Sequence, residues 1–244
     1  MRGTLVVLRR ELSGYFGTPV AYVFLIIFLA MAGALTWIFG GFYDRGQADL
    51  RAFFNWIPVL FLVLVPALAM RLWAEERRSG TAELLLTLPI SLTQAVLGKF
   101  LAAWLFVGVA LLLTTTNWWT VAYLGEPDHG VIAASYLGSF LMAGGYLAIG
   151  GFISAMTKNQ VIAFVLTLVT CFLFMLGGFT GVVEWVREIA GNQVAELVGS
   201  FSFQTRFAAI SRGVIGLRDL VFFLSLIGLF LYANVVAVDL KKAD

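Results

Sequence analysis

The sequence has very few of the residues that build cofactor sites and soluble surfaces. Its 244 residues include one cysteine and one histidine. A disulfide framework, a structural zinc site or a haem needs several such ligands together, so the chain has almost no material for them. Charged residues are 12% of the chain, against roughly 25% in a soluble domain. With 61% hydrophobic residues and a mean hydropathy of +0.94, an integral membrane protein is predicted.

Six apolar stretches are long enough to cross a bilayer, because about 20 helical residues span about 30 Å of hydrocarbon. The first follows Arg9 and Arg10, but its apolar core is too long for a signal peptide. Cys171 lies in the fifth stretch and is interpreted as a packed thiol. The fold class is therefore all-α, with transmembrane helices expected at residues 20–40, 54–73, 100–124, 131–156, 161–179 and 220–238.

Lysines and arginines predict the orientation, since they are enriched in cytoplasmic loops. Six spans place both termini on one side, and ten of the 16 basic residues fall on that side. Both termini are therefore expected in the cytoplasm. The ten residues are Arg2, Arg9, Arg10, Arg71, Arg77, Arg78, Lys99, Lys158, Lys241 and Lys242.

Ionisable residues are missing from the expected spans, apart from Arg71 at the end of the second. A proton- or sodium-coupled carrier normally places such groups in the membrane, so that class is disfavoured. The most polar patch inside a span holds Thr114, Thr115 and Asn117. Helix packing explains these residues most simply, and a role facing a substrate pathway is the alternative.

A phosphate-binding loop is also missing. The one Gly-Lys pair, Gly98 and Lys99, is followed by Phe100 rather than by Ser or Thr. The chain is expected to bind no cofactor of its own, and any ATP and Mg²⁺ would be bound by a partner. Such a partner needs an exposed surface to contact.

The stretch EERRSGTAELLLTLPISLTQAVLGK, residues 75–99, is the longest candidate for that surface. Thr81 is suited to cap a short helix, with Glu83 near its positive N-terminal end, and Pro89 ends it. Ser91 and Gln94 then match a capping box that starts a second helix leading into the third span. The residues leave two interpretations open: a solvated connector, or a docking element.

Two further amphipathic segments are expected outside the spans. Residues 1–19 have Leu5, Leu8 and Leu12 at helical spacing, opposite the arginine pair, as in an interfacial helix. Residues 182–199 hold two short pieces on the outer side that are too short to span. They are interpreted as a re-entrant or interfacial hairpin, with a packed cap as the alternative.

Four segments carry a resemblance to a known family. They are RRELSGYFGTPVAY (9–22), EERRSGTAELLLTLPIS (75–91) with LGK (97–99), ISAMTKNQVIAF (153–164) and SRGVIGLRDLVFFLS (211–225). Together they resemble the membrane subunits of type-2 ABC exporters, especially the gliding-motility-type permeases and their relatives in nitrous-oxide-reductase maturation. The resemblance implies one transmembrane domain over residues 1–244, with an interfacial helix, a coupling helix between the second and third spans, and two short outer helices.

The resemblance also implies a set of partners and a docking site. The partners would be two copies of an ABC ATPase, a second copy of this chain, and an accessory protein with a periplasmic domain, all in a bacterial inner membrane, with no nucleic acid. Glu75 and Glu76 would engage the ATPase, while Gly80 and Thr81 set the bend. The full set carried over is Glu75, Glu76, Arg77, Gly80, Thr81, Glu83 and Pro89, with Lys158 as a weaker contact.

The functional hypothesis is therefore the permease subunit of an ATP-driven exporter, with no catalysis in this chain. Two alternatives remain. The chain would be a mechanical transducer if ATPase-driven motion reached a periplasmic partner without transport. It would be an ATP-independent transporter if no ATPase bound it.

Overall fold

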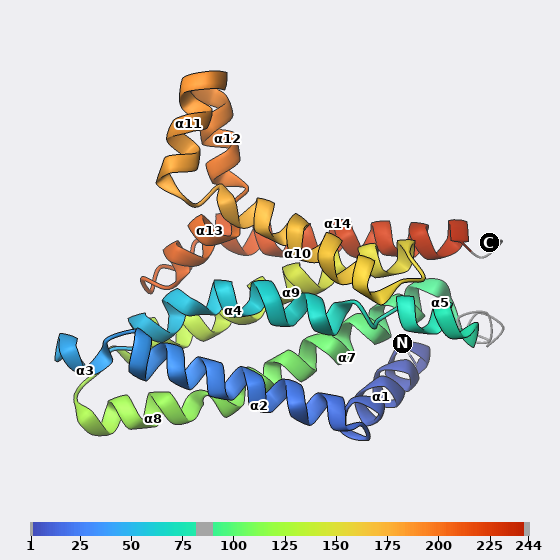
Figure 1. The fold of residues 1–244 in the computed structure, drawn as a ribbon, viewed down its shortest axis with the longest axis horizontal. Coiled ribbons are helices and arrows are strands. Elements are labelled where there is room, and N and C mark those ends of the chain that lie inside the picture. Colours follow the sequence, from blue (N-terminus) through green and yellow to red (C-terminus); the bar gives the residue numbers. More distant parts are fainter. Residues whose placement is uncertain (1, 82–89, 242–244) are drawn as a thin grey trace.

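The computed structural model describes residues 2–81 and 90–241, and these residues form helices with no strand among them. The helices of the bundle run along the long dimension of the molecule (Figure 1). They are α2 (Pro19–Ala34), α4 (Arg51–Ala69), α7 (Leu92–Leu113), α8 (Thr115–Leu124), α9 (His129–Met156), α10 (Gln160–Leu176) and α14 (Leu217–Leu240). The other helices are α1 (Arg2–Phe16), the π-helix η1 (Leu35–Phe39), α3 (Phe42–Arg45), α5 (Ala74–Ser79), α11 (Thr180–Ala190), α12 (Asn192–Ser200) and α13 (Phe203–Ile210).

Five helical segments of the described chain are long and apolar enough to cross a membrane. A sixth is reached only if α10 and α11, which meet at an angle of 78°, count as one broken span. The all-helical class is confirmed, and the chain is a multi-pass membrane protein with five or six spans. The five segments are Pro19–Phe39, Arg51–Ser79, Leu92–Leu124, His129–Met156 and Leu217–Leu240.

Helix α9 is the centre of the bundle and packs against α4, α7, α10 and α14. Its glycines allow close approach of the neighbouring helices. A Cβ at Gly150 would lie 2.4 Å from the Cβ of Ala69, and one at Gly144 would lie 2.9 Å from Ile227 Cδ1. The small residues of the fourth predicted span therefore mark a tight helix contact.

The third predicted span is one apolar segment but two helices. Helix α7 starts at Leu92 because Ser91 accepts a hydrogen bond from the Gln94 amide, and the Gln94 side chain accepts one from the Ser91 amide. This confirms the predicted capping box. The unbroken helix expected over residues 100–124 is interrupted at Thr114, whose hydroxyl donates to the Leu111 carbonyl at 2.6 Å. Such back-bonding competes with the helical ladder.

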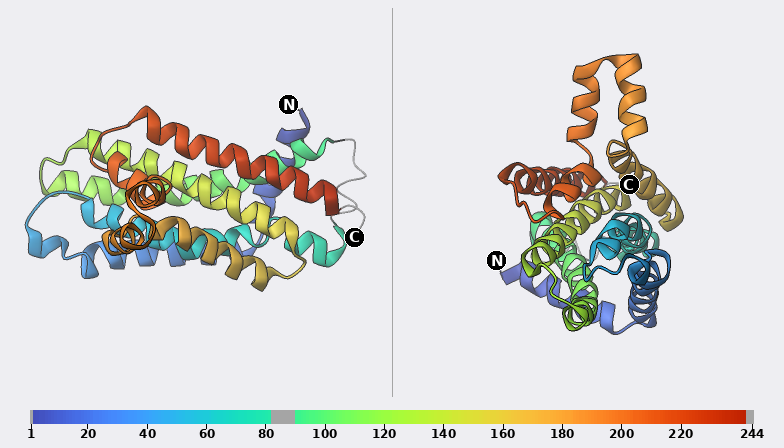
Figure 2. Two further views of the ribbon diagram at one scale, coloured as in Figure 1. Left: turned by 90° about the horizontal axis from the view of Figure 1, so that it is seen from above. Right: turned by 90° about the vertical axis from the view of Figure 1, so that its left-hand side faces the viewer.

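Helices α11 and α12 form a hairpin that projects sideways from the bundle (Figures 1 and 2). Side chains of α11 are not buried, and α12 buries Ala195 alone. The hairpin therefore buries almost none of its side chains against the described bundle, and both interpretations of residues 182–199 stay predictions. A third short helix, α13, follows it and was not predicted from the sequence.

Helix α1 lies along the first turns of α7 rather than alone. Val7 is 3% exposed, and a Cβ at Gly98 would lie 2.6 Å from the Val7 Cβ. Leu5 is 56% exposed, so part of the predicted apolar stripe faces away from the bundle. Both chain termini and α5 lie at this end of the molecule (Figure 1), which we call the terminus end.

Replacing Gly98 by Ala is expected to destabilise the protein by about 1–3 kcal/mol, because the new methyl group overpacks the α1–α7 contact. Gly228→Ala is the matched control, since nothing lies within 4 Å of a Cβ at Gly228. There the better helix propensity of Ala should stabilise by roughly 0.5–1 kcal/mol. Thermal denaturation of the two purified variants in detergent should shift in opposite directions. Equal shifts would contradict the close contact.

Candidate functional site

The interruption of the helix between α4 and α5 is stabilised by a serine of the central helix, α9. The Ser154 hydroxyl donates to the Met70 carbonyl at 2.9 Å and accepts from the amides of Trp73 at 3.1 Å and Ala74 at 3.0 Å. Backbone groups left open by the break are thereby satisfied away from water. Arg77 adds a hydrogen bond from its guanidinium to the Ala155 carbonyl. The start of α5 is fixed to the end of α9.

The far end of α5 is a glycine cap. Gly80 has a φ of +73°, the left-handed conformation that favours glycine after a helix. The Ser79 hydroxyl donates to the Glu75 carbonyl at 3.0 Å and lies 2.9 Å from the Thr81 hydroxyl. The chain direction after α5 is therefore set by Gly80, with Thr81 bonded back to the helix. Glu83 and Pro89 of the predicted docking element lie outside the described residues.

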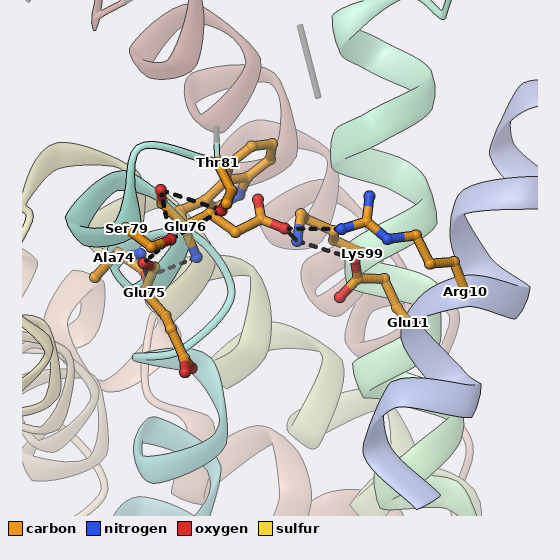
Figure 3. Close-up of polar contacts among 10 residues, drawn as sticks. Arg10, Glu11, Ala74, Glu75, Glu76, Ser79, Thr81 and Lys99 are labelled. Carbon is orange, nitrogen blue, oxygen red and sulfur yellow. Dashed lines mark hydrogen bonds and ion pairs between the residues drawn. The ribbon is translucent and has the colours of Figure 1, made fainter. Parts of the chain in front are cut away.

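A buried ion cluster joins α5 to α1 and α7 (Figure 3). The Lys99 ammonium lies 2.7 Å from Glu76 Oε1 and 3.1 Å from Glu11 Oε1. The Lys99 side chain is 3% exposed, against 14% for Glu76 and 17% for Glu11. Arg10 reaches the same Glu76 oxygen at 3.9 Å, and the indole of Trp73 lies 5.3 Å from the ammonium. Three elements distant in sequence meet at one cation.

Tyr15 lies beside this cluster on α1. Its ring stacks on Phe106 of α7 with the centroids 5.3 Å apart. Burial raises the pKa of the Tyr15 phenol well above its usual value, and the nearby carboxylates of Glu11 and Glu76 raise it further. The phenol is therefore neutral, and the cluster gains no further negative charge from it.

The predicted docking residues divide into two groups. Glu75, Gly80 and Thr81 are exposed, whereas Glu76 and Arg77 are half-buried and bonded to other helices. Lys158 is exposed in the turn between α9 and α10, two helices that α5 contacts. The structure thus gathers these residues at the terminus end. It places Glu76 within the cluster rather than on the open surface.

The polar patch of the third span makes contacts of helix packing. Thr114 is 1% exposed, and its hydroxyl lies 3.1 Å from the Tyr136 hydroxyl of α9. Asn117 accepts a hydrogen bond at 3.1 Å from the Trp37 indole, which follows α2. Thr115 donates to the Leu112 carbonyl at 2.7 Å. Each of the three side chains has a hydrogen-bond partner within the protein, and a pathway role for them stays a prediction.

Lys99 and Glu11 are the site residues that sequence reasoning missed. Lys99 was expected on the cytoplasmic side, and with Gly98 it was rejected as part of a phosphate-binding loop, but no ion pair was expected for it; Glu11 was not singled out. A signal was present, because Lys99 stands between apolar residues in a stretch reading AVLGKFLAA. A cation in such a run is rarely buried without a partner. The partner itself, 88 residues away, has no local signal.

Comparison with known families decides the class of the chain. The family described as "ABC-2 family transporter protein" matches residues 43–238, well over half of the sequence. The chain belongs to the ABC-2 family of transporter proteins. A comparison with curated proteins returned no match. The ABC-2 match includes α5, Glu76 and Lys99, whereas α1 precedes it. In the described part of the chain, no group of three or more His, Cys, Asp or Glu side chains is placed to bind a metal ion.

Replacing Lys99 by Met should destabilise this ABC-2 protein by about 3 kcal/mol, because two partly buried carboxylates lose their shared cation. Adding Glu11→Gln and Glu76→Gln to Lys99→Met should recover part of the loss, since the uncompensated charges disappear. Thermal denaturation in detergent measures both. A Lys99→Met protein as stable as the parent would show that the ion cluster does not contribute to the stability of the fold.

Proposed function

We propose that this chain is the permease subunit of an ATP-driven ABC exporter and that the partner ATPase docks on α5. Membership of the ABC-2 family supports a permease role and association with an ABC ATPase and a membrane. The observation that carries the docking assignment is the geometry of α5. Its exposed residues Glu75 and Arg78 stand on a helix whose other side is fixed to α9 and α7.

The contacts on the fixed side of α5 would transmit force to the bundle. A force applied at Glu75 or Arg78 acts on a helix that is bonded to α9 through Ser154 and to α7 through Lys99. Both helices belong to the membrane bundle. Closure of an ATPase dimer against two such permeases would therefore reshape the bundle directly. Glu76 acts within the chain in this scheme, and Glu75 acts toward the partner.

The proposed assembly contains two copies of this chain and two ATPase subunits that bind ATP and Mg²⁺. It lies in a bacterial inner membrane with both termini in the cytoplasm. The resemblance to gliding-motility-type and nitrous-oxide-reductase-maturation permeases adds an accessory protein with a periplasmic domain. The laterally projecting α11–α12 hairpin, unburied on the opposite half of the molecule from α5, is the surface that such a partner would meet.

Charge reversal at the surface of α5 tests docking. Glu75→Arg should lower recovery of the ATPase with affinity-purified permease by about tenfold, equivalent to ~1.4 kcal/mol of binding free energy. The Glu75 side chain is exposed, so the thermal stability of the permease should not change. Glu184→Arg on exposed α11 is the matched control and should keep the ATPase bound. Unchanged recovery with Glu75→Arg would contradict docking on α5.

The proposed orientation is tested by cysteine labelling. Cys171 is fully buried, so the native chain should give little background with a membrane-impermeant thiol reagent. Trp185→Cys, at a position 63% exposed on α11, should react when the reagent is added outside spheroplasts. Glu75→Cys should react only after the membrane is permeabilised. The reverse labelling pattern would show that the chain has the opposite orientation in the membrane.

A further inference from the structure

An apolar groove runs along the lipid-facing side of α7, α8 and α9. Its volume is about 640 Å³, within the ~300–1,000 Å³ typical of ligand pockets. One wall runs from Leu105 to Trp118, the other holds Ala133 and Phe140, and Leu12 of α1 closes the end nearest the termini. The groove therefore lies in the spanning part of the bundle, apart from the docking surface.

The shape of the groove is built into the fold. Phe140 stacks on Trp104 with ring centroids 4.4 Å apart, and Trp104 donates to the Phe140 carbonyl at 2.8 Å. Gly108 leaves room for this ring, since a Cβ there would lie 3.0 Å from Phe140 Cε2. The Tyr136 hydroxyl on the groove wall is hydrogen-bonded to Thr114, so it does not need a polar group on the ligand as a partner. A largely apolar ligand is indicated.

The length of the groove fits one lipid chain. Leu105 and Trp118 are thirteen residues apart, which corresponds to about 20 Å of helix, enough for an acyl chain of one leaflet, which occupies about half of the ~30 Å hydrocarbon core. Lys99 and its carboxylates lie about 9 Å before Leu105 along α7, on the same rise per residue. The closed end of the groove therefore lies just inside the polar boundary of the bundle.

A cation stands at that boundary. Arg9 lies three residues before Leu12 on α1, so its side chain neighbours that of Leu12 one helical turn closer to the N-terminus, although the leucine stripe as a whole lies opposite the arginine pair. Its side chain is exposed, and it makes no ion pair with the described residues, in contrast to Arg10, which pairs with Glu76. Arginine binds phosphate groups well, and the cytoplasmic leaflet of a bilayer is anionic. An apolar groove ending near a guanidinium that pairs with no described carboxylate complements an anionic phospholipid.

We propose that this groove binds one acyl chain of an anionic phospholipid, with the lipid phosphate at Arg9. The site goes beyond the proposed function and does not require an ATPase or a transported cargo. It shares α1 with the ion cluster, because Leu12 follows Glu11 directly. Lipid in the groove would therefore contact the same helix that the buried cluster fixes to α5.

Native mass spectrometry of the purified full-length chain with added phosphatidylglycerol tests the proposal. The parent protein should retain one lipid per chain. Ala133→Phe places an aromatic ring in the groove from an exposed position and should lower retention about tenfold. Ala30→Phe is the matched control, because Ala30 is exposed on α2 away from the groove. Equal retention by the two variants would overturn the site.

Three further variants keep the outcome decisive if Ala133→Phe does not fold. Val109→Phe fills the groove from the opposite wall and should also lower retention. Arg9→Gln should weaken phosphatidylglycerol binding about fivefold, as expected for one cation near an anionic lipid. Arg9→Lys should restore it. Retention that ignores both Val109→Phe and the charge at Arg9 would overturn the proposal.

The competing occupant is a second copy of this chain. Leu112 lines the groove and is 67% exposed, while the native Cys171 is fully buried. In the described part of the chain, the thiol introduced by Leu112→Cys is therefore exposed, whereas that of Cys171 is not. Under oxidation in membranes it should stay monomeric if lipid fills the groove. Efficient disulfide-linked dimers would place a partner chain there and overturn the lipid site, while co-purification of an ATPase would still test the proposed function separately.

Discussion

The buried ammonium of Lys99 is the constraint on which the terminus end of the structure depends. An unpaired cation that is 3% exposed would cost several kcal/mol, so the chain must bring carboxylates to it. Glu76 comes from α5, 23 residues before Lys99, and Glu11 from α1, 88 residues before it. The requirement of one charge thus fixes two otherwise independent segments against α7. Val7 against Gly98 and Tyr15 against Phe106 complete the same interface.

A second constraint acts at the break between α4 and α5. Backbone amides inside a membrane protein need partners in the protein, because the hydrocarbon offers none. Ser154 meets this need for Trp73 and Ala74, and Gly150, one turn earlier, lets α4 approach α9 closely enough. The position of α5 therefore follows from two small residues on the central helix. A larger side chain at either site would separate the docking helix from the bundle that it is proposed to drive.

The sequence predicted the parts of this fold that local patterns encode. Apolar length predicted the membrane class and most spans, and Ser91 with Gln94 predicted the start of α7. The break at Thr114 was missed because a threonine can continue a helix or bend it, and only its bonds to Leu111 and Tyr136 decide. The ion cluster was missed for a different reason. Glu11 and Lys99 are 88 residues apart, so their pairing depends on how α1 packs and not on any periodicity.

The two constraints together determine which parts of the terminus end form one unit. Displacing α5 relative to α1 would separate Glu76 from Arg10 and break the bond between Glu76 and the Lys99 that Glu11 also binds. Leaving such charges buried and unpaired costs about 3–5 kcal/mol. A displacement shared by α1, α5 and the first turns of α7 leaves these contacts intact and costs none of that energy. Helix α1 therefore forms one mechanical unit with α5, the proposed docking helix, although it precedes the matched ABC-2 region and lies more than fifty residues before α5 in the chain.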